Sequence, residues 1–180
     1  MKFSLWTDYG ALNSKPVFDA FEYSLTTNGY DVVYNSHDAD VNCIWSVLFN
    51  GRMAPNKEIW KQKKPTIVLE VGGINRGKTW KVGLNGINRD AYFSPGGNSS
   101  SRAKQLGLVL KPWRTSGEYI LICGQHEKSQ QWESMPNMTA WLGNTINTIR
   151  EYTDMPIYWR PHPRYPVTYV EQDFKNVVRQ

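Results

Sequence analysis

The segment from Tyr158 to Arg164 combines cationic side chains with two prolines, in the order Tyr-Trp-Arg-Pro-His-Pro-Arg. Because proline fixes φ and disfavours helix at the residue before it, we expect this chain to be extended. With a period near two residues, Arg160, His162 and Arg164 face roughly one way, whereas in a polyproline-like twist they splay apart. One guanidinium group can bind two phosphate oxygens at once, through two parallel hydrogen bonds. A diphosphate site and a proline-rich connector whose arginines pair with surface carboxylates both fit this pattern.

A second polar segment, Gly124–Ser129, follows an apolar run that reads as a buried strand. Gly124 permits a close backbone approach, and the side chains of Gln125, Lys128 and Ser129 can bond a base, a ribose or a phosphate. The plainer reading is a polar loop that caps the next helix. Ligands of open α/β sheets bind outside the carboxyl ends of the strands. Since the next strand ends at Arg160–Arg164, a parallel sheet places both segments at one edge.

The segment Gly72–Thr79 matches the phosphate-binding pattern G-x-x-x-x-G-K-[ST] and follows a predicted strand. A phosphate-binding loop must open a helix, whose amino terminus supplies amides and a favourable dipole. Here the following residues contain Gly83 and Gly86 and lack an apolar stripe. A small kinase that uses this loop is therefore kept as an alternative, for which Lys78→Ala should abolish nucleotide binding.

The elements that must position these residues alternate between strand and helix along the chain. Apolar runs predict strands at 2–7, 31–34, 41–49, 66–71, 119–123 and 155–159. Helical spacing predicts helices at 17–25, at 55–60 and at 138–152. Residues 72–101 are rich in Gly, Asn and Ser and read as a long functional loop region. The alternation predicts an α/β fold of two Rossmann-like units with parallel sheets, 1–110 and 111–180, the second apparently incomplete.

A strand ending in Gly124-Gln125, a long helix, and a strand ending in Arg160-Pro161-His162-Pro163 resemble the donor half of GT-B glycosyltransferases. The chain is similar in particular to capsule-polysaccharide-type transferases and to phage-encoded proteins with this layout. The resemblance covers roughly residues 118–166. It implies a GT-B arrangement, donor phosphates bound by His162 with Arg160 beside it, and a nucleotide contact from Gln125. The donor-binding residues so expected are Gly124, Gln125, Lys128, Ser129, Arg160, His162 and Arg164.

An inverting transfer of this kind needs a carboxylate that deprotonates the acceptor hydroxyl, and it needs no metal. Asp90, Glu70 and Asp8 are the candidate bases, because each lies at or near a predicted loop of the first half; Asp90 and Glu70 rank above Asp8. The acceptor is either a saccharide or, for a viral gene, a hydroxymethylated DNA base flipped out of its duplex. The acceptor-binding residues expected are Tyr9, Gly10, Arg76, Lys78, Trp80 and Arg89.

Composition is that of a globular chain with a basic surface. The 180 residues carry a net charge of +5, which suits a phosphorylated or polyanionic partner. Cys43 and Cys123 both lie in apolar runs and are expected to be buried, without metal-ligand spacing. No tightly bound cofactor is expected, the nucleotide sugar being a co-substrate. No apolar stretch approaches the length of a membrane span, so we expect no membrane partner and a cytoplasmic location, the host cytoplasm if the gene is viral. A non-catalytic module that binds nucleic acid or saccharide is the remaining alternative.

Overall fold

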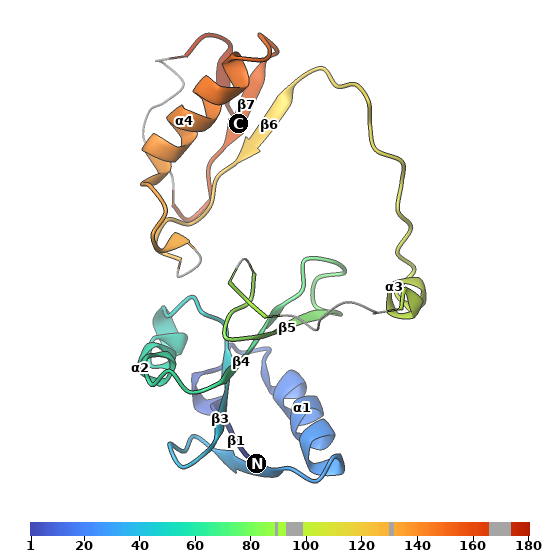
Figure 1. Ribbon diagram of the computed structural model, residues 1–180, viewed down its shortest axis with the longest axis vertical. Coiled ribbons are helices and arrows are strands. Elements are labelled where there is room, and N and C mark those ends of the chain that lie inside the picture. Colours follow the sequence, from blue (N-terminus) through green and yellow to red (C-terminus); the bar gives the residue numbers. More distant parts are fainter. Residues whose placement is uncertain (89, 93–98, 130–131, 166–173) are drawn as a thin grey trace. The chain divides into compact units, whose positions relative to one another are not determined.

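The computed structural model describes residues 1–88, 90–92, 99–129, 132–165 and 174–180 (Figure 1). The chain divides into two compact units, Met1–Gly96 and Gly97–Gln180. The sequence had suggested a boundary at residue 110, whereas helix α3 (Ser101–Gln105) and the extended chain after it group with the second unit.

The first unit contains one mixed sheet with the strand order β2-β1-β3-β4-β5. Its strands are β1 (Lys2–Leu5), β2 (Asp31–Tyr34), β3 (Val41–Trp45), β4 (Thr66–Val71) and β5 (Trp80–Leu84). β1 pairs in parallel with β2 and with β3, and β3 pairs in parallel with β4. β5 pairs antiparallel with β4. The helical elements are the short turns η1 (Thr7–Tyr9) and η2 (Gly51–Met53) and the helices α1 (Lys15–Thr27) and α2 (Asn56–Lys61).

Apolar side chains cover both faces of this sheet, as a parallel sheet requires. On one face Val17, Phe18 and Leu25 of α1 pack on β1, β3 and β4. On the other, Ile59 of α2 packs against Ile44 and Val68. α1 has a proline in its first turn, and its chain leaves through Gly29 at φ +78°, a conformation that glycine adopts without strain.

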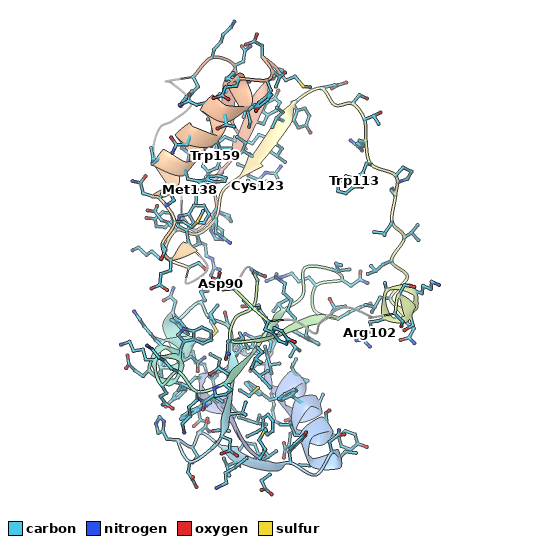
Figure 2. The ribbon with its side chains drawn as sticks, viewed as in Figure 1. Asp90, Arg102, Trp113, Cys123, Met138 and Trp159 are labelled. Atoms are coloured by element: carbon cyan, nitrogen blue, oxygen red, sulfur yellow. The ribbon has the colours of Figure 1, made fainter. Side chains whose placement is uncertain are left out.

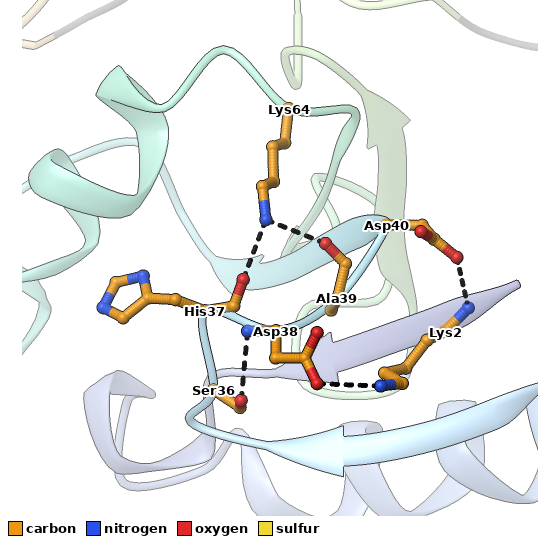
Figure 3. Close-up of polar contacts among 7 residues, drawn as sticks. All are labelled: Lys2, Ser36, His37, Asp38, Ala39, Asp40 and Lys64. Atoms are coloured by element: carbon orange, nitrogen blue, oxygen red, sulfur yellow. Dashed lines mark hydrogen bonds and ion pairs between the residues drawn. The ribbon is translucent and has the colours of Figure 1, made fainter.

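Two lysine side chains, one from β1 and one from the chain just before β4, fasten the connection between β2 and β3 (Figure 3). Lys64 Nζ donates hydrogen bonds to the carbonyl oxygens of His37 and Ala39, at 2.8 and 2.9 Å. Lys2 Nζ lies 2.9 Å from the carboxylate of Asp38, and this contact lowers the pKa of Asp38. Lys64 is the last residue of the basic segment Lys61-Gln62-Lys63-Lys64, and its ammonium group is therefore bound by backbone carbonyls.

The second unit is built on a three-stranded parallel sheet with the order β6-β7-β8. Its elements are β6 (Ile120–Cys123), α4 (Met138–Arg150), β7 (Ile157–Arg160) and β8 (Val177–Arg179). Met138, Leu142 and Ile146 of α4 pack on Ile157 and Trp159 of the sheet (Figure 2). The opposite face carries the exposed side chains of Leu121, Cys123 and Val178. The segment that leads into β6 includes Trp113, whose side chain is 97% exposed.

The structure confirms an α/β fold with a parallel-rich sheet, compatible with a Rossmann-like architecture, and it corrects several details. Strand β5 lies inside the segment predicted to be loop, and β8 adds a strand that the sequence analysis missed. Cys43 is buried as expected, and burial raises the pKa of its thiol. The prediction of a buried Cys123 is wrong, because Ile120 and Ile122 take the face of β6 that packs toward α4. No helix among the described residues is long and apolar enough to cross a membrane.

Candidate functional site

The carboxyl ends of β6 and β7 lie side by side and bring the two polar segments together. The two strands pair in parallel with Cys123 opposite Arg160, so the next residues of both strands leave at the same edge. The amide of Gly124 donates to the carbonyl of Arg160 at 2.8 Å, which fastens the two exits to each other. This edge is where open α/β sheets place ligands.

Two histidines, one from each segment, meet at this edge. The ring centroids of His126 and His162 are 5.2 Å apart in an edge-to-face arrangement, and Tyr165 lies 5.2 Å from His126. Nδ1 of each imidazole accepts a backbone N–H from two residues further on, Lys128 for His126 and Arg164 for His162, both at 3.2 Å. A neutral imidazole that accepts at Nδ1 carries its proton on Nε2. Both rings therefore have a donor nitrogen, Nε2, that these bonds leave free.

This edge carries basic side chains and, beside them, one carboxylate: burial and the Glu127 carboxylate raise the pKa of Tyr165. Burial, the neighbouring His126 and the charge of Arg164 all lower the pKa of His162. Lys128 and Arg164 are exposed, and neither forms an ion pair with a carboxylate among the described residues. The arginine–carboxylate pairing that a plain connector would show is thus not present in the part of the chain described. A bound phosphate would relieve the crowding of positive charge.

The other predicted donor-binding residues have more varied surroundings. Gln125 Oε1 accepts the amide of His126 at 2.8 Å, and the amide of Ser129, a buried residue, donates to the carbonyl of His126 at 2.9 Å. Both contacts shape the loop that carries His126. Arg160 is still part of β7, and its Nη2 donates to Gln180 Oε1 at 3.1 Å. No described contact joins Arg160 to His162, and Arg164 contacts His162 through its backbone N–H.

Gly124 lies directly against the buried ring of Trp159. A Cβ at this position would lie 2.8 Å from Cζ3 of the buried Trp159 ring and closer still to Cη2. The ring is fully buried in the core under α4.

We therefore expect Gly124→Ala to lower the free energy of unfolding of the second unit by about 1–3 kcal/mol, the usual cost of overpacking. Thermal unfolding of the variant measures this. Gly117→Ala is the matched control, because its added Cβ would meet only the Tyr119 carbonyl at 3.8 Å. Equal stability of the two variants would show that Trp159 yields at no cost.

In the first unit, a cavity of about 600 Å³ lies outside the carboxyl ends of β1 and β2, against α1. Asp8 lines it, and so do Ser14, Phe18 and Glu22 from the helical side. The amide of Asp8 donates to Asn35 Oδ1 at 3.2 Å, and its carbonyl accepts Nε of Arg52 at 3.1 Å. The backbone of Asp8 is therefore fixed from two directions, while its side chain is exposed.

The loops after β1 and β3 are held together by Asn56, and the loop after β3 contains residues with strained backbone. Asn56 Nδ2 donates to the carbonyls of Tyr9 and Trp45, at 3.2 and 3.0 Å, and so ties the turn after β1 to the end of β3. Ser46 and Phe49 take φ values of +62° and +44°. Non-glycine residues rarely adopt this conformation, and in folded proteins such strain concentrates at functional sites.

The two higher-ranked candidate bases lie elsewhere. Glu70 is half-buried on β4, opposite Lys81 in the register, and its Oε1 accepts the amide of Val71 at 3.0 Å. Asp90 is exposed in the turn after β5 (Figure 2). Neither lines the cavity beside α1. Of the three candidate bases, Asp8 is the one that lines this cavity.

The predicted acceptor-binding residues are dispersed over the first unit. Tyr9 stacks on Trp6 with ring centroids 6.1 Å apart, and Gly10 packs on Ser14. Trp80 packs edge-on against the buried Trp45 at 5.8 Å, so it serves the core rather than a stacking surface. Arg76 and Lys78 are exposed on the connection between β4 and β5. Arg89 lies outside the described residues.

The segment Gly72–Thr79 does not open a helix in the structure. Gly72–Thr79 connects two antiparallel strands, and strand β5 follows it where a phosphate-binding loop needs a helix. Its special residues serve the hairpin: the amide of Gly72 donates to the Thr79 carbonyl at 2.9 Å, and Asn75 and Gly77 take φ values of +46° and +85°.

Several contributors to these sites were missed by the sequence analysis. His126 and Tyr165 complete the histidine cluster, and Asp19, Tyr34 and Arg52 line the cavity beside α1. Lys15, Asp19 and Glu22 follow one another at helical spacing, and this spacing indicates that all three lie on the side of α1 that lines the cavity. The others come together only through tertiary contacts.

Among the residues that the structure describes, no group of three or more His, Cys, Asp or Glu side chains is placed to hold a metal ion. Comparison of the chain with protein families, with curated proteins and with solved structures found no match.

Proposed function

We propose that the second unit binds the diphosphate of a nucleotide sugar at the His126–His162 edge and that the chain transfers the sugar to a hydroxyl acceptor. The observation that carries the proposal is the histidine pair, held at the carboxyl edge of a parallel sheet beside cations that no described carboxylate neutralises. Nε2 of His162 and the guanidinium of Arg164 are the donors assigned to the phosphates. The resemblance to GT-B glycosyltransferases supports the same assignment.

In the proposed transfer, Asp8 of the first unit is the base. Its carboxylate takes the proton of the acceptor hydroxyl as the hydroxyl oxygen bonds to the anomeric carbon of the sugar. The bond from that carbon to the diphosphate oxygen breaks, and its electron pair leaves with the nucleoside diphosphate. His162 and Arg164 stabilise the negative charge that develops on this leaving group.

A binding module without turnover is the competing function, and it is favoured by the open face of the second sheet, which α4 does not cover. The two functions differ in one measurement. A transferase releases UDP, or another nucleoside diphosphate, from the matching nucleotide sugar in the presence of an acceptor, whereas a binding module holds the nucleotide and releases none.

The proposal predicts that UDP binding strengthens as the pH falls from about 7.5 to about 6, because a bound phosphate stabilises the imidazolium form of His162. The lowered pKa of free His162 means that binding takes up a proton in this range. We expect the UDP affinity to rise by about threefold to tenfold, as measured by calorimetry in buffers of different ionisation enthalpy. The His162→Gln variant keeps a neutral hydrogen-bond donor but has no imidazole, and we expect it to lose most of the pH dependence of UDP binding. Any pH dependence that remains in this variant comes from the titration of UDP itself.

The same pKa gives the sign of the stability change without ligand. A histidine with a lowered folded-state pKa favours the neutral form, so the free energy of unfolding falls as the pH drops below 6.5, the ordinary pKa of the group. A pKa of His162 at or above that value, measured by NMR in the free protein, would contradict the described cluster.

A further inference from the structure

The cavity beside α1 has polar groups left over after its internal contacts are made. Lys15 Nζ pairs with both carboxylate oxygens of Asp19 at 2.8 Å, and Glu22 accepts the hydroxyl of Tyr34. The carboxylate of Asp8 has no hydrogen bond or ion pair with any described residue. Ser14 is 3% exposed and lines the cavity, and its hydroxyl makes no capping bond and has no partner in the described ranges. A buried hydroxyl and a carboxylate are thus open to a ligand.

An anion is a poor fit for this cavity. The amino terminus of a helix attracts anions through free amides, but here residue 16 is proline and has no N–H. The amides of Val17 and Phe18 both donate to the Ser14 carbonyl at 3.0 Å. With Asp19 neutralised by Lys15, the carboxylates of Asp8 and Glu22 outnumber the remaining cation, Arg52. Phosphate groups would be repelled more than they are attracted.

A neutral ring that carries several hydroxyl groups fits what remains. Carboxylates accept hydrogen bonds from hydroxyl groups, and the Ser14 hydroxyl both donates and accepts. Leu12, whose side chain is 91% exposed, supplies apolar surface for the carbon face of such a ring. A volume of about 600 Å³ lies within the range of small-molecule sites.

We propose that this cavity binds a saccharide through Asp8, Ser14 and Glu22, and that it does not bind a nucleic-acid backbone. The assignment of that saccharide as the acceptor of the transfer rests on the proposed function; the binding itself does not. The site differs from the hairpin residues Arg76, Lys78 and Trp80, for which the sequence had suggested acceptor contacts.

The test is an amide NMR titration of the full chain with neutral methyl hexopyranosides in the gluco, galacto and manno series. We expect at least one of them to shift the amides of Thr7, Ser14, Glu22 and Tyr34. Asp8→Asn and Ser14→Ala should each weaken that binding at least about threefold, consistent with the loss of one hydrogen bond. Asp154→Asn, an exposed carboxylate of the second unit, is the matched control and should leave it unchanged.

Inorganic phosphate and a short DNA duplex are titrated in parallel. Shifts of the cavity amides with either of them, or no shift with any glycoside, would overturn the inference. UDP added to the same samples reports on the proposed function separately, through the amides of Gly124, Gln125 and Arg164. Glycoside binding without UDP binding would support the saccharide site and contradict the transferase proposal. UDP binding without glycoside binding would contradict the saccharide site and leave the nucleotide site of the transferase proposal supported.

Discussion

Asp8→Asn is expected to lower the rate of sugar transfer by about 100-fold to 10,000-fold, the usual contribution of a general base. Asparagine has almost the shape of aspartate and keeps the backbone contacts to Asn35 and Arg52, but it cannot take up the proton of the acceptor hydroxyl. Release of nucleoside diphosphate from UDP-sugars with glycoside acceptors measures the rate. Binding of UDP should stay within about twofold of the unchanged protein, because the donors assigned to the phosphates are His162 and Arg164 and not Asp8.

Glu70→Gln and Asp90→Asn are the matched controls for this loss. Both convert a carboxylate of the first unit into its amide, and neither residue lines the cavity beside α1. We expect both variants to keep nearly full activity. If Asp8→Asn is active and one of these two is not, the base assigned from the cavity is wrong and the order suggested by the sequence is restored.

His162→Ala should weaken UDP binding at least about tenfold, because it removes a hydrogen bond to a charged group. The side chain is partly exposed, and its replacement leaves the core under α4 in place. Isothermal titration calorimetry measures the affinity. Arg164→Ala is expected to act in the same direction through loss of the guanidinium.

His37→Ala and Arg102→Ala are the controls, one for each residue type. His37 is exposed in the first unit, and Arg102 is exposed on α3. Both should bind UDP as tightly as the unchanged protein. Equal affinity of His162→Ala and His37→Ala for UDP would exclude His162 from the phosphate site.

Much of the fold could be predicted because apolar runs bounded by turn residues identify buried strands. The bounds of β2 and β4 agree with the prediction, and α1 and α4 follow from helical spacing. β3 ends at Trp45, earlier than expected, because Ser46 takes a positive φ and leaves the ladder. Such a local conformation has no signature in an apolar run.

The strands that the sequence did not predict are those that form only because a neighbouring strand pairs with them. β5 contains Gly83 and an exposed Val82, and only pairing with β4 makes it a strand. β8 has three residues and is fixed by β7. In both cases the tertiary contacts override a weak local preference.

For the candidate sites, the sequence predicted which loops meet but not which side chains do. The parallel pairing of β6 and β7 brings residues 124–129 and 160–164 to one edge, as the order of elements implied. The contact of His126 with His162 depends on loop conformations set by Gln125 and by the backbone bonds to both Nδ1 atoms. Arg160 was expected to join them and instead remains in the ladder of β7.

The phosphate site at the histidine pair is tested most directly by titrating the unchanged protein with UDP and following its amides by NMR. We expect saturable shifts of the amides of Gly124–Lys128 and of His162, Arg164 and Tyr165, with the remaining described amides little affected. Shifts confined to Gly72–Thr79, or no shift at a UDP concentration well above that of the protein, would contradict a phosphate site at the histidine pair.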